Sequence, residues 1–66
     1  MTIYYNGQKE LIHVARLTEW LQLKNLDQLN YLAVSVNGTV IPKVRYDQVM
    51  LSDGDAIDTF SPAGGG

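Results

Sequence analysis

Two Asn-Gly pairs, Asn6-Gly7 and Asn37-Gly38, constrain the fold of this 66-residue chain more than any other feature. Both residues of such a pair tolerate positive φ, which the tight turn of a β-hairpin requires. Each pair stands between short runs that are rich in β-branched and aromatic residues, and such runs favour strands. The sequence therefore predicts two hairpins, one at the start of the chain and one past its middle.

The strands follow from the alternation of apolar and polar residues. The first hairpin joins a strand at 2–5 to a return strand at about 9–14, and the second joins 32–36 to 39–41. A last strand is predicted at 56–60. The residues expected to face the core from these strands are Ile12, Val14, Leu32, Val34, Val36 and Ile57.

Two segments between the strands are predicted to be irregular. Pro42 has no amide hydrogen and so disfavours a central position in a sheet, which predicts an edge or a loop at 43–45. Asp53-Gly54-Asp55 has the composition of a turn that positions the last strand, and it lacks the spacing of a calcium-binding loop.

One helix is predicted near residues 16–24. Leu17, Trp20, Leu21 and Lys24 recur at helical spacing, so three apolar side chains line one face. Trp20 is therefore expected in the core rather than as a platform for a cofactor. If the first and last strands lie side by side, the helix covers one face of a mixed sheet of about four strands. The predicted fold class is α+β with a β-grasp, ubiquitin-like layout.

The composition argues against several classes of protein. The chain has no cysteine, which excludes disulfides and thiolate metal clusters, and its single histidine, His13, excludes a multi-histidine metal site. Catalysis and metal binding by the chain itself are therefore not expected. The net charge is −2 and the five basic residues are scattered, which argues against nucleic-acid binding. Apolar runs are only a few residues long, so we expect no membrane span and a cytoplasmic protein.

The sequence ends in three glycines, Gly64, Gly65 and Gly66. We expect one domain over residues 1–60, followed by a flexible tail over 61–66. Glycine lacks Cβ, so such a tail can enter a channel that is too narrow for other side chains, and six extended residues reach roughly 20 Å. A free carboxylate is a poor electrophile, so chemistry at this end needs an activating enzyme that forms a mixed anhydride. An idle, disordered tail is the alternative interpretation.

Several short motifs follow one another in a specific order along the chain. They are Val34-Ser35-Val36-Asn37-Gly38, Ile41-Pro42-Lys43, Tyr46, Leu51-Ser52-Asp53-Gly54-Asp55-Ala56-Ile57 and Gly65-Gly66. Their order and spacing resemble the ThiS family, the sulfur carrier proteins of thiamine biosynthesis. The resemblance departs from the family pattern at Arg16, where members often have threonine, and at Tyr46, where they often have tryptophan.

The resemblance implies a function in which the chain is a co-substrate rather than an enzyme. Gly66 would be adenylated by an E1-like adenylyltransferase of the ThiF type and converted to a thiocarboxylate, with sulfur from a sulfur-donor protein. A thiazole synthase of the ThiG type would accept the sulfur. ATP and magnesium would belong to the activating enzyme, and the chain would bind no cofactor.

Four residues are candidates for contact with these partners. Phe60 alternates with inward-facing residues, so it is expected to point outward beside the tail as an aromatic anchor, and Tyr4 is expected in the same patch. Asp53 and Asp55 are candidates for contact with basic residues of the activating enzyme. The alternative functions are of two kinds. The chain could be a different ubiquitin-like sulfur carrier, such as the small subunit of molybdopterin synthase, or it could be a binding module whose tail is idle.

Overall fold

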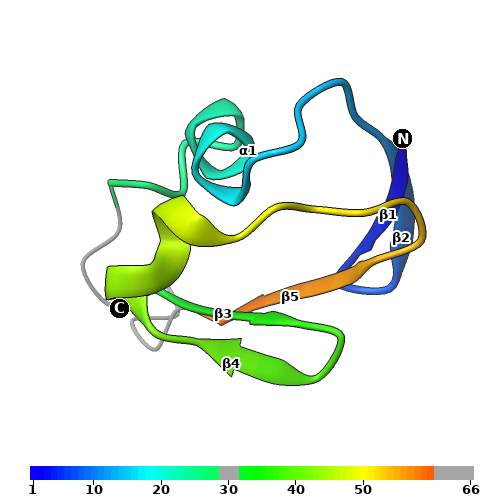
Figure 1. Cartoon of the computed structure of the whole chain (residues 1–66). Helices are drawn as coiled ribbons and strands as arrows, with labels where there is room; N and C mark the ends of the chain where they lie inside the picture. Colours follow the sequence, from blue (N-terminus) through cyan, green and yellow to red (C-terminus); the bar gives the residue numbers. More distant parts are fainter. Residues whose placement is uncertain (29–31, 61–66) are drawn as a thin grey trace.

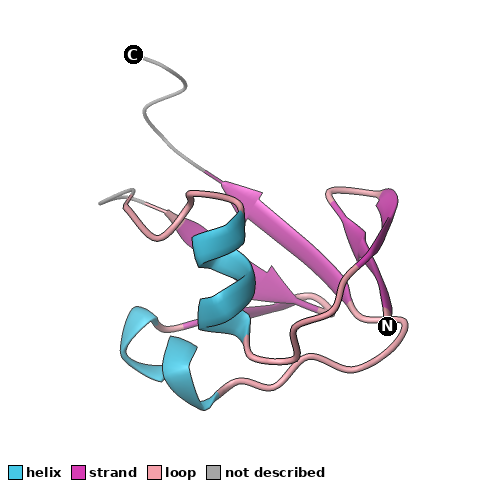
Figure 2. Ribbon diagram, turned by 90° about the horizontal axis from the view of Figure 1, so that it is seen from above, coloured by secondary structure: helices cyan, strands magenta, loops and turns pink. Residues whose placement is uncertain are grey.

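The fold is a single mixed β-sheet with one α-helix lying across one of its faces (Figures 1 and 2). It is seen in a computed structural model that describes residues 1–28 and 32–60. The strands are β1 (Thr2–Tyr5), β2 (Gln8–Leu11), β3 (Ala33–Val36), β4 (Thr39–Ile41) and β5 (Ala56–Phe60). The helices are α1 (Leu17–Leu23) and a 3-10 helix, η1 (Lys43–Gln48).

The strand order is β2-β1-β5-β3-β4, so the first and last strands of the chain lie next to each other in the centre of the sheet. β1 and β5 run parallel, with Tyr4 opposite Ala56 and Tyr5 opposite Ile57. All other neighbouring pairs are antiparallel. The predicted β-grasp layout is confirmed. The sheet has five strands rather than about four, and each of the five lies at a segment where a strand was predicted.

Both predicted hairpins form at the Asn-Gly pairs. Asn6 has a φ of 48° and Asn37 a φ of 53°, and each following glycine has a φ of 85°. Positive φ at both positions gives a turn whose twist matches that of the flanking strands. The return strand of the first hairpin is shorter than predicted, since β2 ends at Leu11 and Ile12 packs into the core from the segment that follows.

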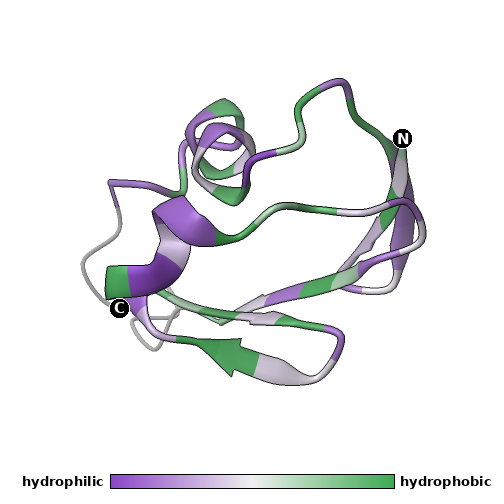
Figure 3. Ribbon diagram, in the orientation of Figure 1, coloured by the Kyte–Doolittle hydropathy of each residue, from purple (hydrophilic) through white to green (hydrophobic). Residues whose placement is uncertain are grey.

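The core lies between α1 and the face of the sheet that α1 covers. Ile3 and Ile57 from the sheet, and Leu17 and Trp20 from α1, have no exposed surface. Along α1, apolar residues recur at helical spacing between polar ones (Figure 3), so that one side of the helix reaches the core. The predicted core positions of Trp20 and Ile57 are confirmed. Burying a side chain of this size stabilises the fold by about 1.5–3 kcal/mol.

The segment after Pro42 forms η1 rather than the predicted edge or loop. The amide of Arg45 donates to the carbonyl of Pro42 at 2.8 Å, which closes the first turn of η1. The Arg16 guanidinium donates to the Asp47 carbonyl at 3.2 Å and connects η1 to the start of α1. The sequence prediction missed η1 because a 3-10 helix of six residues is too short to show an apolar repeat.

Tyr46 holds η1 against the segment that leads into β3. Its hydroxyl donates to the carbonyl of Leu32 at 3.4 Å. Burial of the ring raises the pKa of Tyr46 above its ordinary value, so the phenol stays protonated at neutral pH and remains a donor. Tyr46 also lines a pocket of about 110 Å³ between α1 and η1, together with Leu21, Leu26 and Lys43.

Candidate functional site

The end of β5 is the part of the described chain from which the last six residues depart. β5 is the central strand of the sheet and ends at Phe60, which pairs with Ala33 of β3. Gly64, Gly65 and Gly66, the residues predicted to carry the chemistry, lie outside the described residues, as does the whole segment 61–66. The candidate site that the structure describes is therefore the end of β5 and the sheet surface around it.

The face of the sheet opposite α1, here called the outer face, carries exposed apolar side chains. Phe60 is 63% exposed and Tyr4 is 42% exposed. Tyr4 pairs with Ala56, which lies four residues before Phe60 on the same side of β5, so the two aromatic side chains share the outer face. They are roughly 13 Å apart along the strand. The outward direction predicted for both is confirmed, but the two rings do not form one cluster.

Two further apolar residues extend the outer face toward both edges of the sheet. Leu11 on β2 is 67% exposed and Val40 on β4 is 68% exposed. Leu11 pairs with Thr2, and Val40 pairs with Ser35, so both side chains point away from α1. Neither residue was among the candidates predicted from the sequence. The signal that could have identified them is the two-residue period of side-chain direction, which places each on the face opposite its inward-pointing neighbours.

The carboxylates of Asp53 and Asp55 form hydrogen bonds with neighbouring groups of the same chain at the protein surface. The backbone amide of Thr2 donates to Oδ1 of Asp53 at 2.7 Å. Oδ2 of Asp55 accepts from the backbone amide of Ser52 at 2.8 Å, and Oδ1 accepts from the side-chain amide of Asn37 at 3.0 Å. The two carboxylates hold the turn before β5 against the start of β1 and against the β3–β4 turn. Their predicted contact with a partner stays a prediction.

Asn37 connects the second hairpin to the start of β5. Besides donating to Asp55, its side chain accepts from the backbone amide of Ala56 at 2.9 Å, and its backbone amide donates to the carbonyl of Ala56 at 2.7 Å. Asparagine at this position therefore does two things: it adopts the positive φ of the turn and it binds the neighbouring strand.

Replacing Asn37 with glycine separates these two roles. Asn37→Gly keeps the positive φ but loses two side-chain hydrogen bonds, and should lower the free energy of unfolding by about 1–2 kcal/mol. Asn25→Gly is the matched control, because Asn25 has a φ of 58° and its side chain makes no hydrogen bond in the described part of the chain. Urea unfolding should place that control within about 0.5 kcal/mol of the wild type. Equal effects of the two substitutions would contradict the role assigned to the Asn37 side chain.

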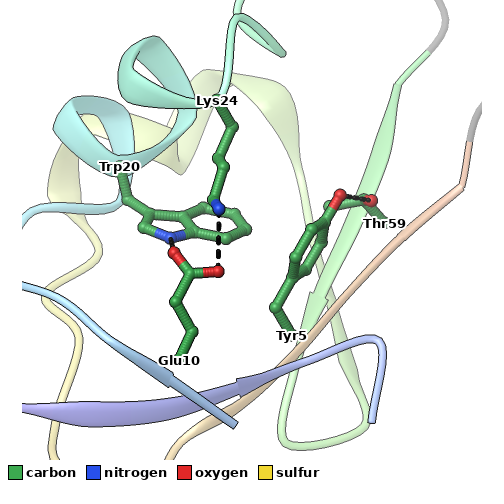
Figure 4. A network of polar contacts seen from close by, with 5 residues as sticks. All are labelled: Tyr5, Glu10, Trp20, Lys24 and Thr59. Atoms are coloured by element: carbon green, nitrogen blue, oxygen red, sulfur yellow. Dashed lines mark hydrogen bonds and ion pairs between the residues drawn. The ribbon is translucent and has the colours of Figure 1, made fainter. Parts of the chain in front are cut away.

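Tyr5, the last residue of β1, and Asn6, the residue after it, both bind Thr59 near the end of β5. The backbone amide of Thr59 donates to Oδ1 of Asn6 at 3.0 Å. The hydroxyls of Tyr5 and Thr59 form a hydrogen bond of 3.0 Å (Figure 4). The sequence predicted only a turn at Asn6, and its contact with Thr59 was not predicted. Spacing along the sequence carried no signal for it, because 53 residues separate Asn6 from Thr59.

An ion pair lies beside Tyr5 between α1 and β2. Nζ of Lys24 is 2.8 Å from Oε1 of Glu10, and Nε1 of Trp20 donates to the other oxygen of that carboxylate at 3.3 Å. Lys24 also lies 5.6 Å from the centre of the Tyr5 ring, where the ammonium is attracted to the π-face. These contacts join α1 to the two strands of the first hairpin, and they involve no free nucleophile or base.

Within 1–28 and 32–60, no three histidine or acidic side chains come together in a way that could hold a metal ion. His13 is exposed in the segment that follows β2. Among the helices of the described ranges, none is long and apolar enough to cross a membrane. What the described surface does offer is a sheet face with four exposed apolar side chains, one of which, Phe60, is the last described residue.

Comparison with known proteins identifies the family. The ThiS family model matches residues 3–66, which is nearly the whole chain. The chain belongs to the ThiS family. A crystal structure of the thiamine biosynthesis protein ThiS from Geobacter metallireducens is 30% identical and superposes with a TM-score of 0.83, with both chains covered completely. An NMR structure of a thiamine biosynthesis protein from the same organism is also 30% identical, with a TM-score of 0.80 over 100% of this chain and 88% of the other.

ThiS membership accounts for the order of motifs along the chain. The family match includes both Asn37-Gly38 and Gly65-Gly66, so it extends beyond the described β-grasp domain into the tail. No curated protein matches the sequence significantly.

Proposed function

We propose that this ThiS-family chain is a sulfur carrier of thiamine biosynthesis and that Gly66 carries the sulfur. The observation that supports this most strongly is the family match over residues 3–66, which includes the glycines at the end of the chain. The position of β5 in the sheet also supports the proposal. β5 is the central strand of the sheet, with a partner strand on each side, and residues 61–66 follow it directly in the sequence.

The proposed chemistry takes place in two steps on partner enzymes. In an E1-like enzyme of the ThiF type, a carboxylate oxygen of Gly66 attacks the α-phosphorus of ATP, and pyrophosphate leaves with magnesium assistance. Hydrosulfide (HS⁻), supplied by a sulfur-donor protein, then attacks the carbonyl carbon. The bond between that carbon and AMP breaks, AMP leaves, and the products are a thiocarboxylate and one proton. A thiazole synthase of the ThiG type receives this sulfur. The location we propose for these reactions is the cytoplasm, where ATP is available.

The outer face is the proposed docking surface for these enzymes. Exposed aromatic residues beside a reactive segment serve as anchors in protein interfaces, and Phe60 is the last described residue before the tail. Tyr4, Leu11 and Val40 extend the apolar surface across the sheet. Asp53 and Asp55 remain candidates for contact with basic residues of the activating enzyme, because a carboxylate oxygen that already accepts one hydrogen bond has a second lone pair.

Intact-mass measurement tests the proposed function. After incubation with a ThiF-type enzyme, ATP, magnesium and a sulfur donor, the mass should rise by the difference between one sulfur and one oxygen atom, and the gain should require ATP. The cognate thiazole synthase should then turn over with the modified protein and not with the unmodified one. A mass that never changes under conditions that load another ThiS protein would refute the proposal and leave the idle-tail alternative.

A further inference from the structure

The last residues of β5 are held in a different way from its first residues. β1 pairs with β5 only at Ala56 and Ile57, because β1 turns away into its hairpin after Tyr5. On the other side of β5 the ladder ends at the pair of Phe60 with Ala33, which is the first residue of β3. End pairs of a ladder open most readily. The backbone pairing around Thr59 therefore protects it on one side only.

Two side chains hold Thr59 on the side of β5 where the backbone pairing with β1 has ended. They belong to Tyr5, the last residue of β1, and to Asn6, the residue after it. Asn6 donates its backbone amide to the carbonyl of Ile57 at 2.9 Å and accepts the amide of Thr59 at its side-chain oxygen. These bonds continue the pattern of the β1–β5 ladder by one more residue pair after the backbone of β1 has turned away. The Tyr5 hydroxyl binds the Thr59 hydroxyl from the side of the sheet that faces α1.

Tyr5 is itself fixed from α1, as Figure 4 shows. Its ring meets Trp20 edge to face, with centroids 4.9 Å apart and an interplanar angle of 80°. The Lys24 ammonium lies near the same ring and is held by Glu10. The hydroxyl of Tyr5 is thus presented to Thr59 by a ring that has few alternative positions. A continuous set of contacts leads from the helix to the residue that stands seven positions before Gly66.

We propose that Asn6 and Tyr5 are positioning residues for the Gly66 carboxylate. They hold Thr59 near the end of β5, the last described segment before residues 61–66, and so limit motion of the chain between the docked domain and Gly66. This inference rests on the proposed function, in which the outer face docks while the tail enters a partner. A loose end of β5 adds freedom between the docked domain and the reacting carboxylate, so fewer bound complexes hold that carboxylate in a reactive position. The hydrogen bonds of Asn6 and Tyr5 to Thr59 are here called the lock. Docking through the outer face does not depend on this lock.

A matched pair of substitutions at Asn6 isolates the side-chain contact. Asn6→Gly keeps the positive φ of the turn and removes the oxygen that accepts from Thr59, whereas Asn6→Asp keeps both. Tyr5→Phe removes only the hydroxyl that binds Thr59. Asn25→Gly serves as a control for replacing a positive-φ asparagine far from β5. Each protein is studied as the full chain, by amide hydrogen exchange and by steady-state kinetics of adenylation with the ThiF-type enzyme.

The exchange measurement tests the lock without any partner. In Asn6→Gly the amide of Thr59 should exchange roughly ten-fold faster than in the wild type, while the amide of Ile57 in the same strand changes little. Asn6→Asp and Asn25→Gly should keep the wild-type rate at Thr59. An unchanged rate at Thr59 in Asn6→Gly would overturn the inference at its first step.

The kinetic measurement tests whether the lock positions the carboxylate. Asn6→Gly and Tyr5→Phe should lower kcat by roughly three- to ten-fold with KM nearly unchanged, and Asn6→Asp should restore kcat. Faster exchange at Thr59 with an unchanged kcat would overturn the positioning role and leave the proposed function standing. If the wild type is not adenylated at all, the proposed function and the positioning role both fail, while the exchange data still decide whether the lock exists.

Discussion

Deletion of Gly66 is expected to abolish thiocarboxylate formation while the domain stays folded. The shortened chain still ends in a carboxylate, on Gly65, but that group stops one residue short, a loss of roughly 3.5 Å of reach. Displacing a reacting group by even about 1 Å can reduce a rate roughly 100-fold, so the deletion should leave no detectable adenylation. Thermal unfolding should be unchanged, because the removed residue stands six positions after the last residue of β5. The fluorescence of buried Trp20 reports the fold directly.

Two alanine variants separate the length of the tail from its lack of side chains. Gly66→Ala and Gly65→Ala keep the reach of the chain and add one methyl group each. If the tail enters a channel that fits bare backbone, Gly65→Ala should impair adenylation and leave the fold intact. Full activity of the Gly66 deletion, measured as wild-type adenylation kinetics and a wild-type gain in mass, would contradict the assignment of the chemistry to this residue. Full activity of Gly65→Ala alone would contradict only the narrow channel.

Much of the fold could be predicted because each signal is local. The Asn-Gly pairs specify positive φ at both turn positions, and the spacing of Leu17, Trp20 and Leu21 specifies one apolar helix face. η1 could not be predicted in the same way. Its six residues turn because Arg45 bonds to the Pro42 carbonyl and because Tyr46 and Arg16 fasten it to distant parts of the chain. Contacts of that kind leave no period in the sequence.

The same distinction applies to the candidate site: features set by local sequence could be predicted, and contacts between distant residues could not. Alternation in the last strand predicted that Phe60 points outward, and the structure agrees. Two hydrogen bonds could not be predicted: that between Asn37 and Asp55, and that between Asn6 and Thr59. Each joins residues that are far apart in the chain and meet only after the sheet has formed. An asparagine in a turn looks the same in sequence whether its side chain is free, as at Asn25 within the described residues, or bonded to another strand, as at Asn37.

Ile57→Asp is expected to unfold the domain. Ile57 has no exposed surface and lies in the central strand, where it pairs with Tyr5 on one side and Val36 on the other. A carboxylate there would be buried without a partner, and the apolar contacts of the isoleucine would be lost as well. The cost should reach about 4–5 kcal/mol or more, which is comparable to the total stability of roughly 3–10 kcal/mol expected for a chain of this length. Circular dichroism should show loss of the cooperative unfolding transition at 25 °C.

Phe60→Asp is the matched control, because it places the same carboxylate on the same strand but on the opposite face. Phe60 is mostly exposed, so the new charge stays in water and the free energy of unfolding should change by less than about 1 kcal/mol. The effect should appear instead in partner binding, as a raised KM for adenylation, if the outer face is the docking surface. A folded Ile57→Asp protein would show that β5 presents its other face to α1. Wild-type KM in a folded Phe60→Asp protein would instead move the docking surface away from the end of β5.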